Sequence, residues 1–200
     1  MAGVPFVGLT GGLGSGKSEA LSALAGLGAA TLSTDAVVHE LLASDELRDV
    51  VVARLGEEVA RDGGLDRSLI AERVFGDDEA RKWLEGELWP RVGQRVAEWK
   101  QDVDALDPPP RAAVVEVPLL FESGMDAAFD ATVAVIADDD VRAERAGARG
   151  HASVEERAGR QLSQEEKAQK ADYAVRNDGT LEELRETLSR VLARLDSASR

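Results

Sequence analysis

One eight-residue stretch of this chain combines residue types and a spacing that suit phosphate chemistry. It reads Gly11-Gly12-Leu13-Gly14-Ser15-Gly16-Lys17-Ser18 and matches the pattern G-x-x-x-x-G-K-[ST]. The glycines let backbone N–H groups face a polyphosphate, Lys17 reaches its β- and γ-phosphates, and the Ser18 hydroxyl is a Mg²⁺ ligand. The stretch predicts a nucleoside triphosphate site whose contact residues are Gly12, Leu13, Gly14, Ser15, Gly16, Lys17 and Ser18.

The segments on either side of this loop have the order that a phosphate loop needs. An apolar run at 4–9 predicts a strand before it, and Leu21, Leu24 and Leu27 lie on one stripe of a predicted helix after it. A helix N-terminus that follows a strand presents oriented N–H dipoles to an anion. The flanking segments therefore support the interpretation of the loop.

Asp35 is the candidate for proton transfer. It follows a short predicted strand at 29–33, and the carboxyl ends of strands line the ligand crevice in open α/β sheets. Two interpretations stay open. Thr34 or Asp35 is the N-cap of the next helix, or Asp35 accepts the proton of an attacking hydroxyl beside the phosphates.

Three arginines share one face of a predicted helix at 141–150, namely Arg142, Arg145 and Arg149. A solvated surface is one interpretation of such a face. A lid that closes over phosphates is the other, and we favour it because the chain as a whole carries a net charge of −14. We assign this lid to residues 140–168.

Strands and helices alternate along the chain, with further strands predicted at 112–117, 131–136 and 173–175. Continuous apolar runs of this kind belong to parallel sheets covered on both faces. The pattern predicts a single α/β domain with a P-loop NTPase/kinase fold, in which helices cover a mostly parallel five-stranded sheet.

Residues 63–107 show helical patterns alone and are too long for a plain crossover, so we predict a helical insertion that covers a substrate. Within it, Pro90 is expected to kink a helix or to begin a new one. Farther along, Ser153 and Glu156 predict the start of a polar helix that runs through Lys170.

Composition narrows the possible functions. The chain has no cysteine, which excludes disulfides and thiolate chemistry, and 38 acidic residues against 24 basic ones argue against a nucleic-acid partner. No apolar run approaches the ~20 residues of a membrane span, and no charged-then-apolar leader is visible. We expect a cytoplasmic protein with no membrane partner and no obligate protein partner.

The chain resembles the dephospho-CoA kinase family over about 4–195. The shared features are the phosphate loop, Leu65-Asp66-Arg67, Pro118-Leu119-Leu120-Phe121-Glu122, the basic residues Arg145, Arg149 and Lys167 with Gln161, and Ala171-Asp172-Tyr173 followed by Asn177-Asp178-Gly179. The resemblance implies transfer of the γ-phosphate of ATP, with Mg²⁺, onto the ribose 3′-hydroxyl of dephospho-CoA.

The resemblance also implies roles for particular residues. Asp35 falls on the family's proposed base, Arg145 on its lid arginine, and Asn177 and Gly179 on the loop near the ATP adenine. The acceptor site is implied at Thr10 and at the segment that contains Pro118, Leu119, Leu120 and Glu122.

Three positions depart from the family's usual pattern. Ser33 stands where the family often has a second Asp, Glu19 where it often has Thr, and Trp89 where it usually has His. Trp89 either stacks on the adenine of the acceptor or packs within the protein. The alternatives to this function are another P-loop kinase, for a nucleoside monophosphate or a sugar acid, and a non-catalytic nucleotide switch.

Overall fold

The computed structural model describes residues 3–61, 64–147 and 161–198. Contacts divide the chain into two compact units, which we call the sheet unit (Met1–Ser33 and Lys100–Arg200) and the helical unit (Thr34–Trp99). The helical unit thus begins and ends earlier than the predicted insertion at 63–107.

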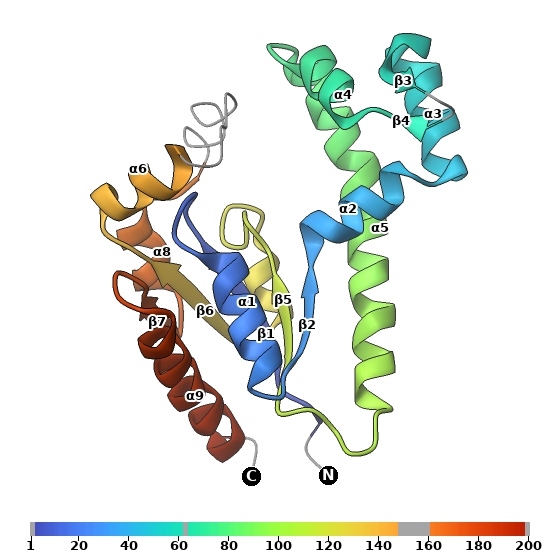
Figure 1. Ribbon diagram of the computed structural model, residues 1–200. Helices are drawn as coiled ribbons and strands as arrows, with labels where there is room; N and C mark the ends of the chain where they lie inside the picture. The colour runs from blue at the N-terminus through green and yellow to red at the C-terminus, as the bar shows by residue number, and fades with distance from the viewer. Residues whose placement is uncertain (1–2, 62–63, 148–160, 199–200) are drawn as a thin grey trace. The chain divides into compact units, whose positions relative to one another are not determined.

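The sheet unit holds the main secondary structure of an α/β domain (Figure 1). Its strands are β1 (Phe6–Gly11), β2 (Ala30–Ser33), β5 (Ala113–Glu116), β6 (Ala131–Ile136) and β7 (Tyr173–Arg176). Its helices are α1 (Lys17–Gly26), α6 (Asp139–Gly147), α8 (Gln164–Lys170) and α9 (Leu181–Ala198), and it also receives the last turns of α5 (Asp78–Asp104).

The five strands form one parallel sheet in the order β2-β5-β1-β6-β7. The central strand β1 pairs with β5, with Leu9 opposite Glu116, and with β6, with Leu9 opposite Val133. Parallel pairing places all carboxyl ends at one edge, so the phosphate loop after β1 lies beside the segments that follow β5 and β6. The predicted α/β class and five-stranded parallel sheet are confirmed.

Helices cover both faces of this sheet. On one face α1 packs against α9, as Figure 1 shows, over a cluster of buried aliphatic side chains that includes Val7, Leu9, Leu24, Val133, Leu188 and Leu192. Alternate residues of a strand point to opposite faces, so Thr10 faces the other side. There it meets Lys167 of α8, which packs against β1, β6 and β7.

The helical unit consists of short helices and the greater part of α5. Its elements are α2 (Thr34–Leu42), α3 (Asp45–Leu55), β3 (Ala60–Arg61), β4 (Gly64–Leu65), α4 (Arg67–Val74) and α5 up to Trp99. Local capping explains two of the starts. Ser44 caps α3 by accepting from the Leu47 N–H, and Asp66 caps α4 by accepting from the Ser68 N–H at 2.8 Å.

Pro90 does not begin a new helix, because α5 continues through it. Proline removes a single helical hydrogen bond, the one to the residue four positions earlier, and this residue is Gly86. In the adjoining turn the Arg91 guanidinium donates to the Glu87 carbonyl at 2.7 Å and to the Glu87 carboxylate at 2.8 Å. These side-chain bonds support the turn that Pro90 weakens.

Two further local predictions are wrong. The region predicted as helical alone, 63–107, also contains a strand, because β4 forms an antiparallel pair with β3, and strands of two residues carry no alternation that a sequence could reveal. The polar helix predicted from Ser153 is not continuous to Lys170, because a new helix, α8, begins after Ser163. Ser163 and Glu166 form its capping box, whereas Ser153 lies outside the described residues.

Within the ranges that the structure describes, none of the helices is both long enough and apolar enough to cross a membrane.

Candidate active site

The phosphate loop connects β1 to α1 through a backbone that only glycine adopts easily. Gly14 and Gly16 have φ angles of 75° and 89°, in the left-handed region. A Cβ on Gly14 would lie 2.6 Å from the carbonyl oxygen of Arg142, and one on Gly16 would overlap the Asn177 amide. The loop is therefore a tight cradle whose N–H groups gather at the N-terminus of α1.

The two polar residues at the start of α1 are placed for contact with phosphates. Lys17 donates from Nζ to the Gly12 carbonyl at 3.1 Å, so its ammonium lies over the loop, and Ser18 is exposed in the first helical turn. The Ser15 hydroxyl is buried in the loop and has no hydrogen-bond partner among the described residues. A glycine cradle with an ammonium and an orphaned hydroxyl fits a triphosphate.

Asn177 joins the phosphate loop to the end of β7. Its side-chain amide donates to the Ser15 carbonyl at 2.9 Å, and its own carbonyl accepts from Arg145 at 2.9 Å. The residue is only 6% exposed. Gly179 follows in the same loop and is exposed, next to the Thr180 and Glu183 pair that hydrogen-bonds across the start of α9.

Two arginines of the predicted basic face contact this assembly from α6. Arg142 donates from Nε to the Leu13 carbonyl at 2.9 Å and pairs with Asp139 at 2.9 Å. Arg145 contacts Asn177, as described above. Arg149 lies outside the described residues, as does the middle of the predicted lid at 140–168. The sequence placed Arg142 on the basic face, but its hydrogen bond to the backbone of the phosphate loop was not expected.

An exposed charge network ties the start of α6 to the loop after β7. Arg176 pairs with Asp138 and Asp178, and the Asp138 N–H donates to Asp178. Burial by itself raises the pKa of Asp178, but the hydrogen bonds from Asp138 and Arg176 outweigh it and hold this pKa below its ordinary value of 3.8. Hydrogen bonds to the carboxylates of Asp178 and Asp138 raise the pKa of Arg176 above its ordinary value. The network helps to fix the loop that carries Asn177.

The segment after β5, which the sequence places at the acceptor side, lies against the end of β1. Thr10 donates from its hydroxyl to the Pro118 carbonyl at 3.3 Å and is fully buried. Leu120 is also fully buried and packs under Gly8, where an added Cβ would come within 3.0 Å of it. Pro118, Leu119 and Glu122 are partly exposed. The structure thus brings the phosphate loop and this segment together.

Two predicted site residues belong to the helical unit. Asp35 is exposed and comes two residues after the end of β2; α2 includes both Thr34 and Asp35, so Asp35 stands in the first turn and not at the cap. Trp89 lies in α5 and is 49% exposed, whereas Trp83 and Trp99 are partly buried.

Among the described parts of the chain, no group of three acidic or histidine side chains is suited to hold a metal ion.

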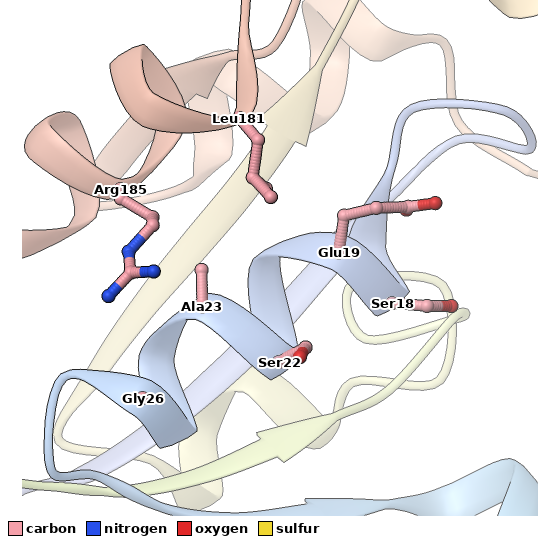
Figure 2. A pocket seen from close by; sticks show the side chains of 7 residues that line it. All are labelled: Ser18, Glu19, Ser22, Ala23, Gly26, Leu181 and Arg185. Atoms are coloured by element: carbon pink, nitrogen blue, oxygen red, sulfur yellow. The ribbon is translucent and has the colours of Figure 1, made fainter.

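A shallow groove of about 320 Å³ runs between α1 and α9 (Figure 2). Glu19 and Leu181 border one end, and Arg185 and Gly26 the other. Ser18 also lines it, but the glycines of the phosphate loop do not. The groove therefore starts beside the phosphate cradle and is not itself the cradle.

The parallel sheet, the cradle after its central strand and the lysine over the loop define a P-loop kinase of the α/β class. Comparisons give the particular family. The family model described as dephospho-CoA kinase matches residues 5–183, and the chain belongs to the dephospho-CoA kinase family.

Relatives agree with this assignment along nearly the whole chain. A dephospho-CoA kinase of Protochlamydia amoebophila is 40% identical over 187 residues, which cover 91% of this chain and 92% of the relative. The crystal structure of TT1252 from Thermus thermophilus superposes with a TM-score of 0.80 at 33% identity, over 96% of this chain and 98% of that one. A dephospho-CoA kinase from Campylobacter jejuni gives a TM-score of 0.70 at 26% identity, over 98% of each chain. Membership makes this chain a phosphotransferase with ATP as its co-substrate.

Proposed function

We propose that this chain transfers the γ-phosphoryl group of ATP to the ribose 3′-hydroxyl of dephospho-CoA, giving coenzyme A and ADP. The observation that carries the proposal is the contact between the donor and acceptor segments. The end of β1, which leads into the phosphate loop, and the segment after β5 meet at the Thr10 hydroxyl and the Pro118 carbonyl, 3.3 Å apart. Family membership then favours dephospho-CoA as the acceptor over a nucleoside monophosphate or a sugar acid.

On the donor side, the proposal gives the phosphates to the backbone of Gly12–Ser18 and to Lys17. Lys17 neutralises charge that builds up between the β- and γ-phosphoryl groups, and its position over the Gly12 carbonyl puts it within the cradle. We assign Asn177 and Gly179 to the adenine side of the site, and Arg145, which donates to the Asn177 carbonyl, to the lid over the phosphates. Arg142 holds the loop itself through the Leu13 carbonyl.

Mg²⁺ belongs to the proposal through Ser18. The ion usually takes one or two protein ligands and completes its shell with water and substrate phosphates, so a single exposed hydroxyl at the start of α1 fits it. When bound there, it supplies further positive charge to the phosphates. The residues of the chain do the rest of the positioning.

The chemical step moves one proton and one phosphoryl group. The acceptor oxygen forms a bond to the γ-phosphorus while the bond between that phosphorus and the β,γ-bridging oxygen breaks, and ADP leaves. We assign the proton of the 3′-hydroxyl to the carboxylate of Asp35. Arg145 and Lys17 stabilise the charge on the phosphoryl oxygens as it develops.

We assign the acceptor to the segment at 118–122 and to the region at 63–107, with the lid at 140–168. Leu119 and Pro118 offer partly exposed contacts, whereas Thr10 and Leu120 are buried and act by shaping the segment. Trp89, half-exposed on α5, is assigned to stack on the adenine of dephospho-CoA. An exposed indole stacks through the face of its ring, so this contact does not need the ring nitrogens of the histidine that the family usually has at this position.

The test is an ADP-release assay with a panel of acceptors. Purified protein, ATP and Mg²⁺ are combined with dephospho-CoA, nucleoside monophosphates, gluconate or shikimate, and the products are identified by mass spectrometry. We expect ADP release to depend on dephospho-CoA and coenzyme A to appear in equal amount. Equal turnover with another acceptor would contradict the substrate assignment, and ADP release without any acceptor would contradict the kinase mechanism.

A further inference from the structure

A fully buried lysine lies beneath the proposed acceptor segment. Lys167, on α8, has no exposed side-chain surface. Its ammonium lies 2.9 Å from Glu122 Oε1, 2.8 Å from the Pro118 carbonyl and 3.4 Å from Thr10 Oγ1. An ammonium has three donors, and each has an acceptor here.

These three acceptors come from two places in the chain. Pro118 and Glu122 are the two ends of the segment after β5, and Thr10 is the penultimate residue of β1, directly before the phosphate loop. One ammonium thus holds both ends of the segment against the strand that leads to the donor site. Thr10 also contacts the segment directly, because its hydroxyl donates to the same Pro118 carbonyl at 3.3 Å.

The carboxylate of Glu122 is committed to this arrangement through one oxygen. Oε1 accepts from Lys167 and also from the Leu162 N–H at 2.8 Å, and the side chain is 13% exposed. The other oxygen, Oε2, is buried and has no hydrogen-bond partner among the described residues. Burial of a charged pair with one unsatisfied oxygen is costly, so a contribution to stability does not by itself explain the pair.

The helix that carries Lys167 is itself held firmly. The Gln164 side chain accepts from the Ala137 N–H at 2.9 Å and donates to the Ala137 carbonyl at 2.6 Å, and both groups are buried. This pair joins α8 to the end of β6. Lys167 is therefore delivered to the acceptor segment from a fixed support.

We propose that Lys167 is a positioning residue for phosphoryl transfer, which sets the shape of the 118–122 segment and hence the alignment of the acceptor hydroxyl with the γ-phosphate. The inference rests on the proposed acceptor role of that segment. Misplacement of a reacting group by about 1 Å costs on the order of 10²-fold in rate, so small shifts of the segment are sufficient.

The experiment separates positioning from mere pairing of charges. Lys167→Met alone leaves the Glu122 carboxylate buried and unpaired, and we expect a drop in Tm on the order of 10 °C. The double variant Lys167→Met/Glu122→Gln removes both charges and should regain most of that loss. Lys170→Met, at an exposed position of the same helix, is the matched control and should behave like the wild type.

The decisive readout is kinetic. In the double variant we expect kcat/KM for dephospho-CoA to fall about 10²-fold, mainly through kcat, while the Kd of a non-hydrolysable ATP analogue stays as in the wild type. A folded double variant with wild-type kcat/KM would overturn the inference, because charge pairing would then be the whole role of Lys167. An equal loss of ATP-analogue binding would overturn it too.

A second variant covers the case in which the double variant does not fold. Thr10→Val keeps the ion pair but removes the hydroxyl that accepts from Lys167 and donates to the Pro118 carbonyl, so kcat with dephospho-CoA should fall several-fold. Tm should drop by a few degrees, because one buried donor loses its acceptor. An unchanged kcat there would also refute the inference. Leu119→Ala tests the underlying assignment separately: if it leaves the acceptor KM unchanged, the proposed acceptor role of the segment fails, whatever Lys167 does.

Discussion

The replacement of Asp35 by Asn separates the two interpretations of this residue, because they predict effects of different size. Asp35 is exposed in the first turn of α2. A carboxylate at a helix N-terminus contributes about 0.3–1 kcal/mol through the helix dipole, and Asn retains part of the polar contacts. In a chain of 200 residues, 1 kcal/mol corresponds to roughly 2–4 °C in Tm, so we expect a loss of about 1–4 °C.

The catalytic interpretation predicts a much larger effect on rate. General bases contribute about 10²- to 10⁴-fold, and loose phosphoryl-transfer transition states depend on the base less, so we expect a fall in kcat near 10². This corresponds to about 2.7 kcal/mol of activation free energy at 1.36 kcal/mol per factor of ten. A helix-dipole contribution alone does not change the barrier of the chemical step.

The assay measures kcat for dephospho-CoA, the Kd of an ATP analogue and the thermal melt of the same preparation. Glu40→Gln is a matched control, because it removes one exposed carboxylate from the same helix. We expect Asp35→Asn to lose about 10²-fold in kcat with unchanged analogue binding, and the control to keep its activity. If Asp35→Asn turns over within a few-fold of the wild type, Asp35 is not the base and the proton leaves by another route.

Three further predictions concern the donor side. Lys17→Ala should melt like the wild type but lose at least ~100-fold in turnover, because a preorganised charge on the phosphates is removed; a cooperative melt with near-normal turnover would contradict the role of the loop. Arg142→Ala should weaken binding of an ATP analogue several-fold, because the Leu13 carbonyl loses its donor, whereas Arg145→Ala should chiefly lower kcat. Equal and negligible effects in both assays would show that these arginines only form a solvated surface. Because the pKa of Asp178 is lowered, its contribution to stability is complete above pH 3.8 and is lost as the pH falls through the lowered value. The difference in unfolding free energy between the wild type and Asp178→Asn should therefore close below pH 3.8. A difference that is constant with pH would contradict the assignment.

Local patterns of the chain predict much of the fold. The phosphate loop is readable because its glycines and Gly16-Lys17-Ser18 are contiguous, and the backbone requirement lies in the same residues that make it. The five strands can be predicted because each is a short apolar run between helical patterns. Such features depend on neighbours in sequence.

Other features depend on residues that are distant in sequence. A lysine on a polar helix suggests a solvated side chain, yet Lys167 is fully buried because β1 and the segment after β5 bring three oxygens to it, from 157, 49 and 45 residues away. Asn177 touches the loop across 162 residues. No local pattern records such meetings, since they arise only when parallel strands align their carboxyl ends.

The sequence alone therefore determined the phosphate loop, the order of strands and helices and, through resemblance, the family. Only the tertiary structure decided which polar side chains hydrogen-bond to the backbone around the site. Arg142 donates to the Leu13 carbonyl, Asn177 to the Ser15 carbonyl and Lys167 to the Pro118 carbonyl. The physical reason is that burial of a charged or polar side chain is favourable only where distant backbone and carboxylate oxygens converge on it, and that convergence is a property of the packed sheet.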